Sequence, residues 1–305
     1  MVRDKIMHKK LGIRSTKDDI AFNIINYFLL TCLGIITLYP FVYMFAVALN
    51  NSSDTLRGGI WLYPRAITLN NFAEAFRDAR IVDSFLISIF RTIIGTVASV
   101  LLNALLAYGV LDKNLKGRKL VLKYIFISTL FSGGIIPFFI LMRDLNLIDN
   151  YLIYIMPALY SFYNMIIVRS SFEALPSSFA EAARIDGAGE LTILFKIYLP
   201  LSMSSLATIA LFIGVFHWND WFAGAFYVST QELKPAATLL QEIIASASSN
   251  SGNMNSSIIG SSSQNVTPQS LQMAFVIILV LPIICVYPFL QKYFVQGTTI
   301  GGIKD

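Results

Sequence analysis

The densest set of groups that could bind a solute is one run of five residues: His217, Trp218, Asn219, Asp220 and Trp221. The face of a Trp ring can cover the C–H surface of a sugar, while an amide and a carboxylate can hydrogen-bond its hydroxyl groups. The run ends an apolar stretch, and polar groups at membrane depth usually face a cavity or a partner. It is therefore a candidate substrate pathway. The alternative is an aromatic belt at the membrane interface, with Asp220 in water.

Other polar residues in apolar stretches form no reaction centre. Arg91 is expected to snorkel to the membrane surface, and Asn103 and Asn164 are expected first to join helices by hydrogen bonds. The chain has only two histidines, which argues against a metal site or a proton relay. Neither paired carboxylates nor a His-rich metal set can be assembled, so the sequence predicts a protein that is not an enzyme.

A second candidate site lies between two apolar stretches, in the loop 170–199. It is predicted to form a helix from Phe179 to Ile185, with Ser177 or Ser178 accepting hydrogen bonds from the free amides of the first turn. Gly187 supplies the left-handed residue that closes this helix. A second helix follows, because four apolar residues recur at i, i+3, i+4 and i+7: Leu191, Leu194, Phe195 and Tyr198.

The first helix of this loop suits a mechanical contact with another protein. The small side chains of Ala182 and Ala183 would let a partner approach closely, and Glu181 offers a charge that an Arg or Lys could pair with.

The elements that must position these residues are membrane helices. The composition is 55% apolar and 13% charged, with a mean hydropathy of +0.64, which indicates a membrane protein. Crossing a hydrocarbon core takes about 20 helical residues. Six uncharged runs are long enough: Ile20–Ser53, Thr92–Leu111, Tyr124–Met142, Asn150–Val168, Ile197–Asn219 and Leu271–Gln291. Because their apolar residues are continuous, the predicted fold is all-α with six transmembrane helices.

The distribution of Lys and Arg sets the expected orientation. Most of them fall in the segments that are inside if both termini are cytoplasmic. Residues 1–19 are then a cytoplasmic segment before a six-helix transmembrane domain at 20–305, the loop 170–199 is cytoplasmic and the loop 228–269 is outside. The net charge of +5 follows from this topology, so nucleic-acid binding is not expected.

The outer loops differ in composition. The first, Asn50–Asp83, contains an amphipathic piece, Asn71–Arg80, expected at the membrane surface. In the last, residues 245–265 are rich in Ser and Asn and predict a flexible loop, either a passive spacer or an arm that contacts an external partner. Cys32 and Cys285 fall within spans and are expected to be packing residues.

The loop 170–199 resembles the EAA loop of binding-protein-dependent ABC importers, which reads Glu-Ala-Ala, three residues, Gly, nine residues, Ile, any residue, Leu-Pro. This chain has Glu181-Ala182-Ala183, Gly187, Ile197 and Leu199-Pro200 at that spacing. The resemblance implies a coupling helix that fits a groove on an ATP-hydrolysing subunit. The residues that it implicates are Glu181, Ala182, Ala183, Asp186 and Gly187.

From Phe22 to Lys304, the chain resembles the maltose-type carbohydrate branch of these permeases, and within it the group serving large oligosaccharides derived from polysaccharides. The C-terminal tail from Gln291 to Lys304 looks like tails that reach toward the ATPase dimer. The resemblance implies the type I ABC importer permease fold, in the bacterial plasma membrane. It also implies three protein partners: a second, homologous permease in a heterodimer, an ATPase dimer that binds the ATP and Mg²⁺, and an extracytoplasmic solute-binding protein.

Two alternatives stay open. A permease for a non-sugar solute would have the same architecture. An ion-coupled secondary transporter would usually carry acidic residues deep in its spans, and none is predicted at mid-depth here. The chain also lacks a phosphate loop ending in Gly-Lys-Ser or Gly-Lys-Thr, so the ATPase would be another protein, and no cofactor is expected in this chain.

Overall fold

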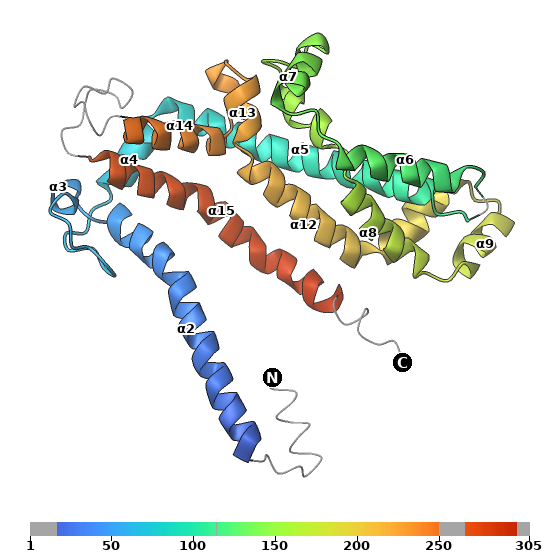
Figure 1. Ribbon diagram of the computed structural model, residues 1–305, viewed down its shortest axis with the longest axis horizontal. Helices are drawn as coiled ribbons and strands as arrows, with labels where there is room; N and C mark the ends of the chain where they lie inside the picture. The colour runs from blue at the N-terminus through green and yellow to red at the C-terminus, as the bar shows by residue number, and fades with distance from the viewer. Residues whose placement is uncertain (1–16, 114, 250–265, 298–305) are drawn as a thin grey trace. The chain divides into compact units, whose positions relative to one another are not determined.

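The computed structural model describes residues 17–113, 115–249 and 266–297. It is built from helices (Figure 1), and within these ranges no strand forms apart from one isolated antiparallel bridge between Asn50 and Ile67. The all-α prediction is confirmed. Residues 1–16 of the expected N-terminal segment, residues 250–265 of the Ser/Asn-rich loop and the end of the tail after Gly297 lie outside the described residues.

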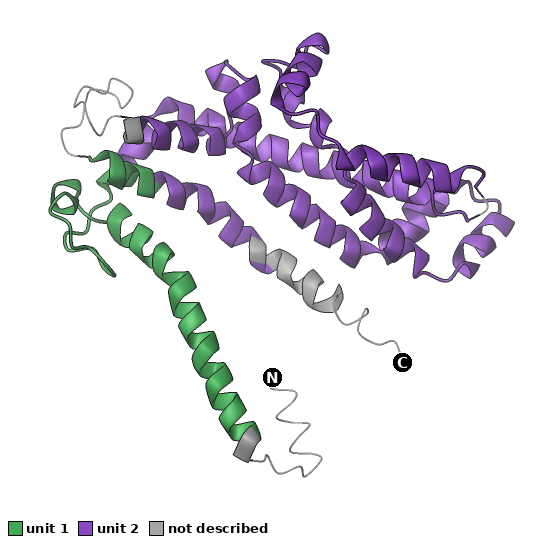
Figure 2. Ribbon diagram, in the orientation of Figure 1, with its two compact units in different colours: residues 1–72, 264–274 green, residues 73–263, 275–305 purple. Residues whose placement is uncertain are grey.

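The chain divides into two compact units, coloured separately in Figure 2. Unit 1 comprises residues 1–72 and 264–274, and unit 2 comprises residues 73–263 and 275–305. Helix α2 (Lys17–Ala48) and the short helix α3 (Ser52–Thr55) belong to unit 1, whereas α4 (Asn70–Arg77) and α15 (Pro268–Gly297) each begin in unit 1 and continue in unit 2.

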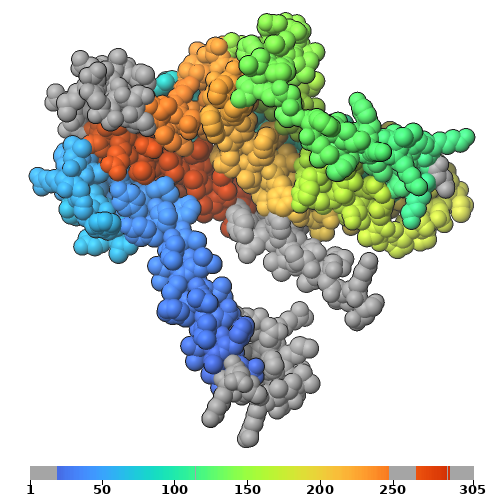
Figure 3. All heavy atoms as spheres, in the orientation of Figure 1, coloured from blue at the N-terminus to red at the C-terminus, as the bar shows by residue number. Residues whose placement is uncertain are grey.

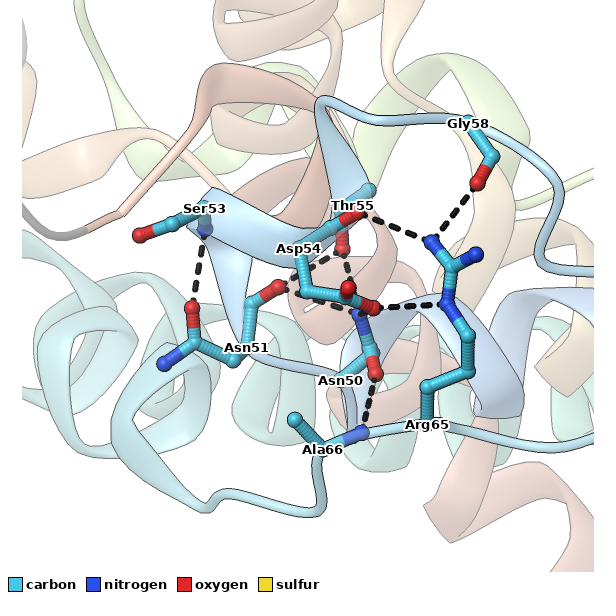
Figure 4. Close-up of polar contacts among 8 residues, drawn as sticks. All are labelled: Asn50, Asn51, Ser53, Asp54, Thr55, Gly58, Arg65 and Ala66. Carbon is cyan, nitrogen blue, oxygen red and sulfur yellow. Dashed lines mark hydrogen bonds and ion pairs between the residues drawn. The ribbon is translucent and has the colours of Figure 1, made fainter.

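Polar contacts hold the loop of unit 1 that follows α2 (Figure 4). Asn50 donates from Nδ2 to Asp54 Oδ2 at 3.0 Å, and its Oδ1 accepts the amide of Ala66 at 2.8 Å. Arg65 Nε donates to the same Asp54 oxygen at 2.9 Å. These bonds from Asn50 and Arg65 lower the pKa of Asp54 from its usual value. These hydrogen bonds therefore hold the backbone of the loop in one conformation.

Helix α5 (Ala79–Gly109) is the central element of unit 2. It packs against α12 (Met203–Asn219) and α8 (Phe162–Glu173) through a face of small and polar residues. A Cβ on Gly95 would come within 2.5 Å of His217 Nε2, so the two helices approach too closely there for any side chain. Asn103 donates to the carbonyl of Leu159 at 3.1 Å and accepts the amide of Ser161 at 3.2 Å, which confirms its helix-joining role.

Among the described residues, three helices are long and apolar enough to cross a membrane, namely α2, α5 and α15. Three bent pairs raise the number to six if each pair is one span: 118–130 with 135–144 at 115°, 151–158 with 162–173 at 52°, and 190–201 with 203–219 at 84°. Counted in this way, the spans agree with the six predicted transmembrane helices, although these three apolar runs are broken rather than continuous helices. Between α6 (Arg118–Leu130) and α7 (Ile135–Asp144), for example, Gly134 takes a positive φ of 84°, which a helix cannot contain.

The region 228–269, which is predicted to be an outer loop, contains more structure than its composition predicts. After α13 (Phe222–Tyr227) and η4 (Gln231–Leu233), helix α14 (Ala236–Ser249) packs on α5 and buries Leu239 and Ile243. The amide of Ala236 donates to Ser88 Oγ at 2.9 Å, which fixes the start of α14 to α5. The prediction of a flexible loop from residue 245 is therefore wrong for residues 245–249.

Candidate functional site

The predicted coupling helix forms as α9 (Ser178–Ile185). The amide of Ala188 donates to the carbonyl of Ala183 at 2.9 Å and that of Gly187 to the carbonyl of Arg184 at 3.0 Å, which together make a Schellman motif. Gly187 has a φ of 82°, the left-handed value expected of it. Ser177 is the N-cap residue but makes no side-chain cap bond, so the expected capping by this hydroxyl is not found.

The side chains of α9 divide into an inner and an outer set. Ala180 is buried, and Ala183 is half-buried against the core that lies between α5, α8 and the helices after the loop. Glu181, Ala182, Asp186 and Gly187 are exposed. Two large apolar residues beside them are also exposed, Phe179 at 51% and Ile185 at 86%. Helix α9 lies at one end of unit 2 (Figures 1 and 3), and the groups that it exposes are small, acidic and apolar.

The second helix of the loop departs from the predicted periodicity. It consists of α10 (Glu190–Ile193), a π-helical turn η3 (Leu194–Tyr198) and α11 (Leu199–Leu201). The buried residues are Ile193, Leu194 and Tyr198, whereas Leu191 and Phe195 are exposed. Leu194 and Tyr198 are buried as predicted and Leu191 and Phe195 are not, so the predicted apolar face is half wrong. The π turn begins at Leu194, so it changes the helical register only from that residue onward.

Glu190 ties α9 to the membrane helices. Its carboxylate accepts two hydrogen bonds from Arg184, at 2.8 and 3.1 Å, and one from the Tyr108 hydroxyl at the end of α5. The Tyr108 ring in turn packs edge-on against Tyr198, with ring centroids 5.2 Å apart. Sequence reasoning missed Glu190, although an acidic residue at a helix start is a recognisable signal.

The predicted solute cluster at the end of α12 is not one continuous surface. His217 is buried against Gly95, and neither of its ring nitrogens has a hydrogen-bond partner among the described residues. Trp218 is also buried and donates from Nε1 to the carbonyl of Leu279 at 3.1 Å, with its ring edge-on to Phe85. His217 and Trp218 therefore pack inside unit 2.

The remaining three residues lie nearer the surface. The exposed Asn219 donates to the carbonyl of Val215 at 2.9 Å, which is a bond within α12. Trp221 is exposed, and its carbonyl accepts the hydroxyl of Thr238 at 2.9 Å. Asp220 ends α12 and caps α13, since its Oδ1 accepts the amide of Phe222 at 3.0 Å.

Asp220 also forms an ion pair with Arg91 of α5, with Nη2 and Oδ2 2.9 Å apart. Arg91 is fully buried, and its guanidinium carbon lies 4.7 Å from the centroid of the Tyr154 ring. The expectation that Arg91 snorkels to the surface is wrong, and so is the alternative that Asp220 is simply in water. A buried guanidinium needs a counter-charge, and Asp220 supplies it.

A cavity of about 560 Å³ opens beside this pair. It is lined by the turn between α6 and α7, by the bent segment before α8, and by the junction of α12 with α13. Of the five predicted residues only Asp220 lines it. Most of the wall is apolar, with aromatic rings among its residues: Phe138, Tyr154, Phe216, Phe222 and Tyr227. The sequence signal for this wall is the pair Gly133-Gly134, at which the helix breaks. It was missed because the residues around it form one apolar run.

The chain is similar to known transport proteins over most of its length. Residues 95–300 match the family model described as the binding-protein-dependent transport system inner membrane component. Two relatives from Bacillus subtilis (strain 168) are the polygalacturonan/rhamnogalacturonan transport system permease protein YtcP and the protein LplC. YtcP is 34% identical, over 93% of this chain and 98% of its own length, and LplC is 33% identical, over 96% and 98%.

A solved structure has a closely similar fold. It comes from a bacterial ABC transporter involved in the import of the acidic polysaccharide alginate. The TM-score is 0.83 at 31% sequence identity, and the match covers 92% of this chain and 99% of that one. The similarity thus includes both the loop that carries α9 and the helices around the cavity.

Proposed function

Because this chain belongs to the binding-protein-dependent transport system inner membrane components, we propose that it is the permease subunit of an ATP-driven importer of sugars or oligosaccharides. The observation that carries the proposal is the exposed, Schellman-capped helix α9, on which Glu181 and Ala182 of the EAA motif face away from the core. A rigid surface helix tied to membrane helices can transmit movement from a separate motor protein.

The proposed assembly contains four kinds of subunit. A second, homologous permease completes a heterodimer, and two ATPase subunits dock on the inner side and bind the ATP and Mg²⁺. A solute-binding protein delivers the cargo outside, in keeping with the description of the family. This chain itself carries no cofactor and catalyses no reaction. Both termini are cytoplasmic in a bacterial plasma membrane, as the distribution of Lys and Arg favours.

The named relatives support an oligosaccharide cargo. YtcP serves polygalacturonan and rhamnogalacturonan, and the structural neighbour imports alginate. A cavity of about 560 Å³ with aromatic walls is of the size and chemistry that sugar rings need. In this proposal Asp220 and the surrounding aromatic residues line the pathway, Asn219 and Trp221 lie near its mouth, and His217 and Trp218 support it from within.

The test of coupling uses the complete complex in lipid vesicles, with cargo-loaded binding protein and ATP. Glu181→Ala and Ala182→Leu should each reduce cargo-stimulated ATP hydrolysis and uptake by about tenfold, because they change the exposed face without touching the core. The matched control is Ser177→Ala, an exposed hydroxyl next to α9 that makes no cap bond.

Unchanged stimulation in both variants would contradict the role of α9. Uptake by this chain without an ATPase, driven by an ion gradient, would instead favour the ion-coupled secondary transporter. Import of a cargo that is not a sugar, with normal coupling, would leave the architecture in place and replace only the substrate class.

A further inference from the structure

The charge of the cavity wall depends on one residue. Among the described residues that line the cavity, Asp220 is the only one whose side chain is charged at neutral pH. The other polar groups on the wall are hydroxyls, from Ser132, Tyr154 and Tyr227. The sign of the electrostatic potential in the cavity therefore follows from what happens to the Asp220 carboxylate.

The carboxylate of Asp220 is held by three donors. Its Oδ2 accepts Arg91 Nη2 at 2.9 Å, and its Oδ1 accepts the amides of Phe222 at 3.0 Å and Ala223 at 3.4 Å. The side chain keeps 17% of its exposure, so part of it still faces the cavity. Arg91 brings the balancing charge, while the two amides fix the position of the carboxylate.

Arg91 does not line the cavity. Its side chain is completely buried behind the wall and stacks over the ring of Tyr154, which itself lines the cavity. Fields of buried charges are weakly screened, so a charge just behind the wall acts on the cavity almost as one on its surface would. The pair presents a wall with no net charge.

We propose that Arg91 sets the charge that the cavity presents to its cargo, and that the neutral wall it creates admits acidic oligosaccharides. Without Arg91 the bare carboxylate of Asp220 would repel the carboxylates of such a cargo, and the neighbouring aromatic rings offer no cation in compensation. The statement about the wall rests on geometry alone, whereas the statement about cargo rests on the proposed function.

The potential can be measured with a thiol probe in the purified full complex. Cys32 and Cys285 are replaced by Ala, and Ser132→Cys then puts one thiol of this chain on the cavity wall. The reaction rates of a cationic and an anionic methanethiosulfonate reagent are compared. Arg91→Met should raise the cation-to-anion rate ratio by about tenfold or more, and Asp220→Asn should lower it by a similar factor.

Two controls separate charge from damage to the fold. The double variant Arg91→Met with Asp220→Asn should return the ratio to that of the parent, because both charges are gone. A thiol at the exposed loop residue Ser177, in place of Ser132, should show no change in any variant. If Arg91→Met cannot be purified, Asp220→Asn tests the same statement with the opposite sign. An unchanged ratio, or a shift in the same direction in both single variants, would overturn the proposal.

The statement about cargo is tested by measuring ATP-driven uptake of trigalacturonate and of its methyl ester. The uptake of each compound by the variant is divided by the uptake of the same compound by the parent complex, so that selection by the binding protein cancels. Arg91→Met should lower uptake of the acid about tenfold more than uptake of the ester. An equal loss of both, or a parent that imports the ester but not the acid, would overturn the cargo statement. ATP-dependent import by the parent would still stand in that case, so the proposed function would survive.

Discussion

Two ion pairs in unit 2 have almost the same distance between nitrogen and oxygen but differ in how deeply they are buried. Arg184 and Glu190 approach to 2.8 Å in the loop that carries α9, with side chains 51% and 57% exposed. Arg91 and Asp220 approach to 2.9 Å beside the cavity, at 0% and 17%. Arg184 and Glu190 position α9, one face of which is exposed. Arg91 and Asp220 link α5 to the junction of α12 with α13, beside the cavity.

The comparison teaches that the environment, not the distance, decides what an ion pair does. An exposed pair contributes about 0–1 kcal/mol, because water and salt screen it. Removing one partner of a buried pair costs about 3–5 kcal/mol, since a charge is left without compensation. Replacing one charge of the pair in the loop is therefore expected to cost little stability. At the cavity wall, replacing one charge alone is expected to cost much more than replacing both.

The largest expected effect is the loss of Arg91. Arg91→Met should destabilise the purified complex by about 3–5 kcal/mol, because it leaves the carboxylate of Asp220 partly buried without its counter-charge. Thermal unfolding of the complex in detergent measures the change. Adding Asp220→Asn should recover most of the loss, and a single variant as stable as the parent would erase the contrast between the two pairs.

A smaller effect is expected where α5 meets α12. Gly95→Ala places a Cβ 2.5 Å from His217 Nε2, and the overpacking should cost about 1–3 kcal/mol. Gly109→Ala is the matched control, because nothing lies within 4 Å of a Cβ at that end of α5. Equal unfolding temperatures for both variants would show that the close approach of the helices is not needed.

The loop has its own glycine test. Gly187→Ala forces an alanine into the left-handed region, at a cost of about 1–2 kcal/mol, and should loosen the end of α9. Gly189→Ala is the control, since Gly189 has a φ of −73° and open space around it. Amide hydrogen exchange of residues 183–188 should quicken only in the first variant. Similar exchange in both would mean that the Schellman motif does not hold α9.

The smallest effect belongs to the exposed pair. Arg184→Ala should change the unfolding free energy by less than about 1 kcal/mol, and the difference should shrink as salt is raised toward 1 M. Unfolding midpoints at low and high ionic strength check this. If Arg184→Ala lowered the unfolding free energy as much as Arg91→Met does, or by an amount that did not depend on salt, the hydrogen bonds from Arg184 through Glu190 to Tyr108 would be buried in the assembled complex.

Much of the loop could be predicted because its signals are local. The turn glycine, the small residues of α9 and the apolar residues after it are all within one short stretch, and Gly187 adopts the expected left-handed backbone. The error concerned Leu191, which lies before the π turn, and Phe195, which lies within it, because both are exposed. Periodicity assumes a regular helix, so it cannot detect a turn that inserts an extra residue.

The cavity wall could not be predicted in the same way. Arg91 and Asp220 are 129 residues apart in the chain, and nothing local to either one reveals the other. Arg91 is expected at the membrane surface, because an isolated charge is expected to seek water, and Asp220 is expected either in the substrate pathway or in water. Likewise, the apolar run from Tyr124 to Met142 contains the pair Gly133-Gly134, but neither residue indicates that the run bends by 115° there or that a cavity lies beside it.

Composition and the uncharged runs by themselves determined that this is a helical membrane protein, and the spacing of residues within 170–199 predicted a helix closed by a glycine. These properties depend on the hydrophobicity and conformational preferences of neighbouring residues, which the sequence states directly. Only the tertiary structure decided which charges are buried together, where helices break and which side chains line the cavity. Those depend on contacts between distant segments, because the free energy of a buried charge is set by the partner that folding brings to it.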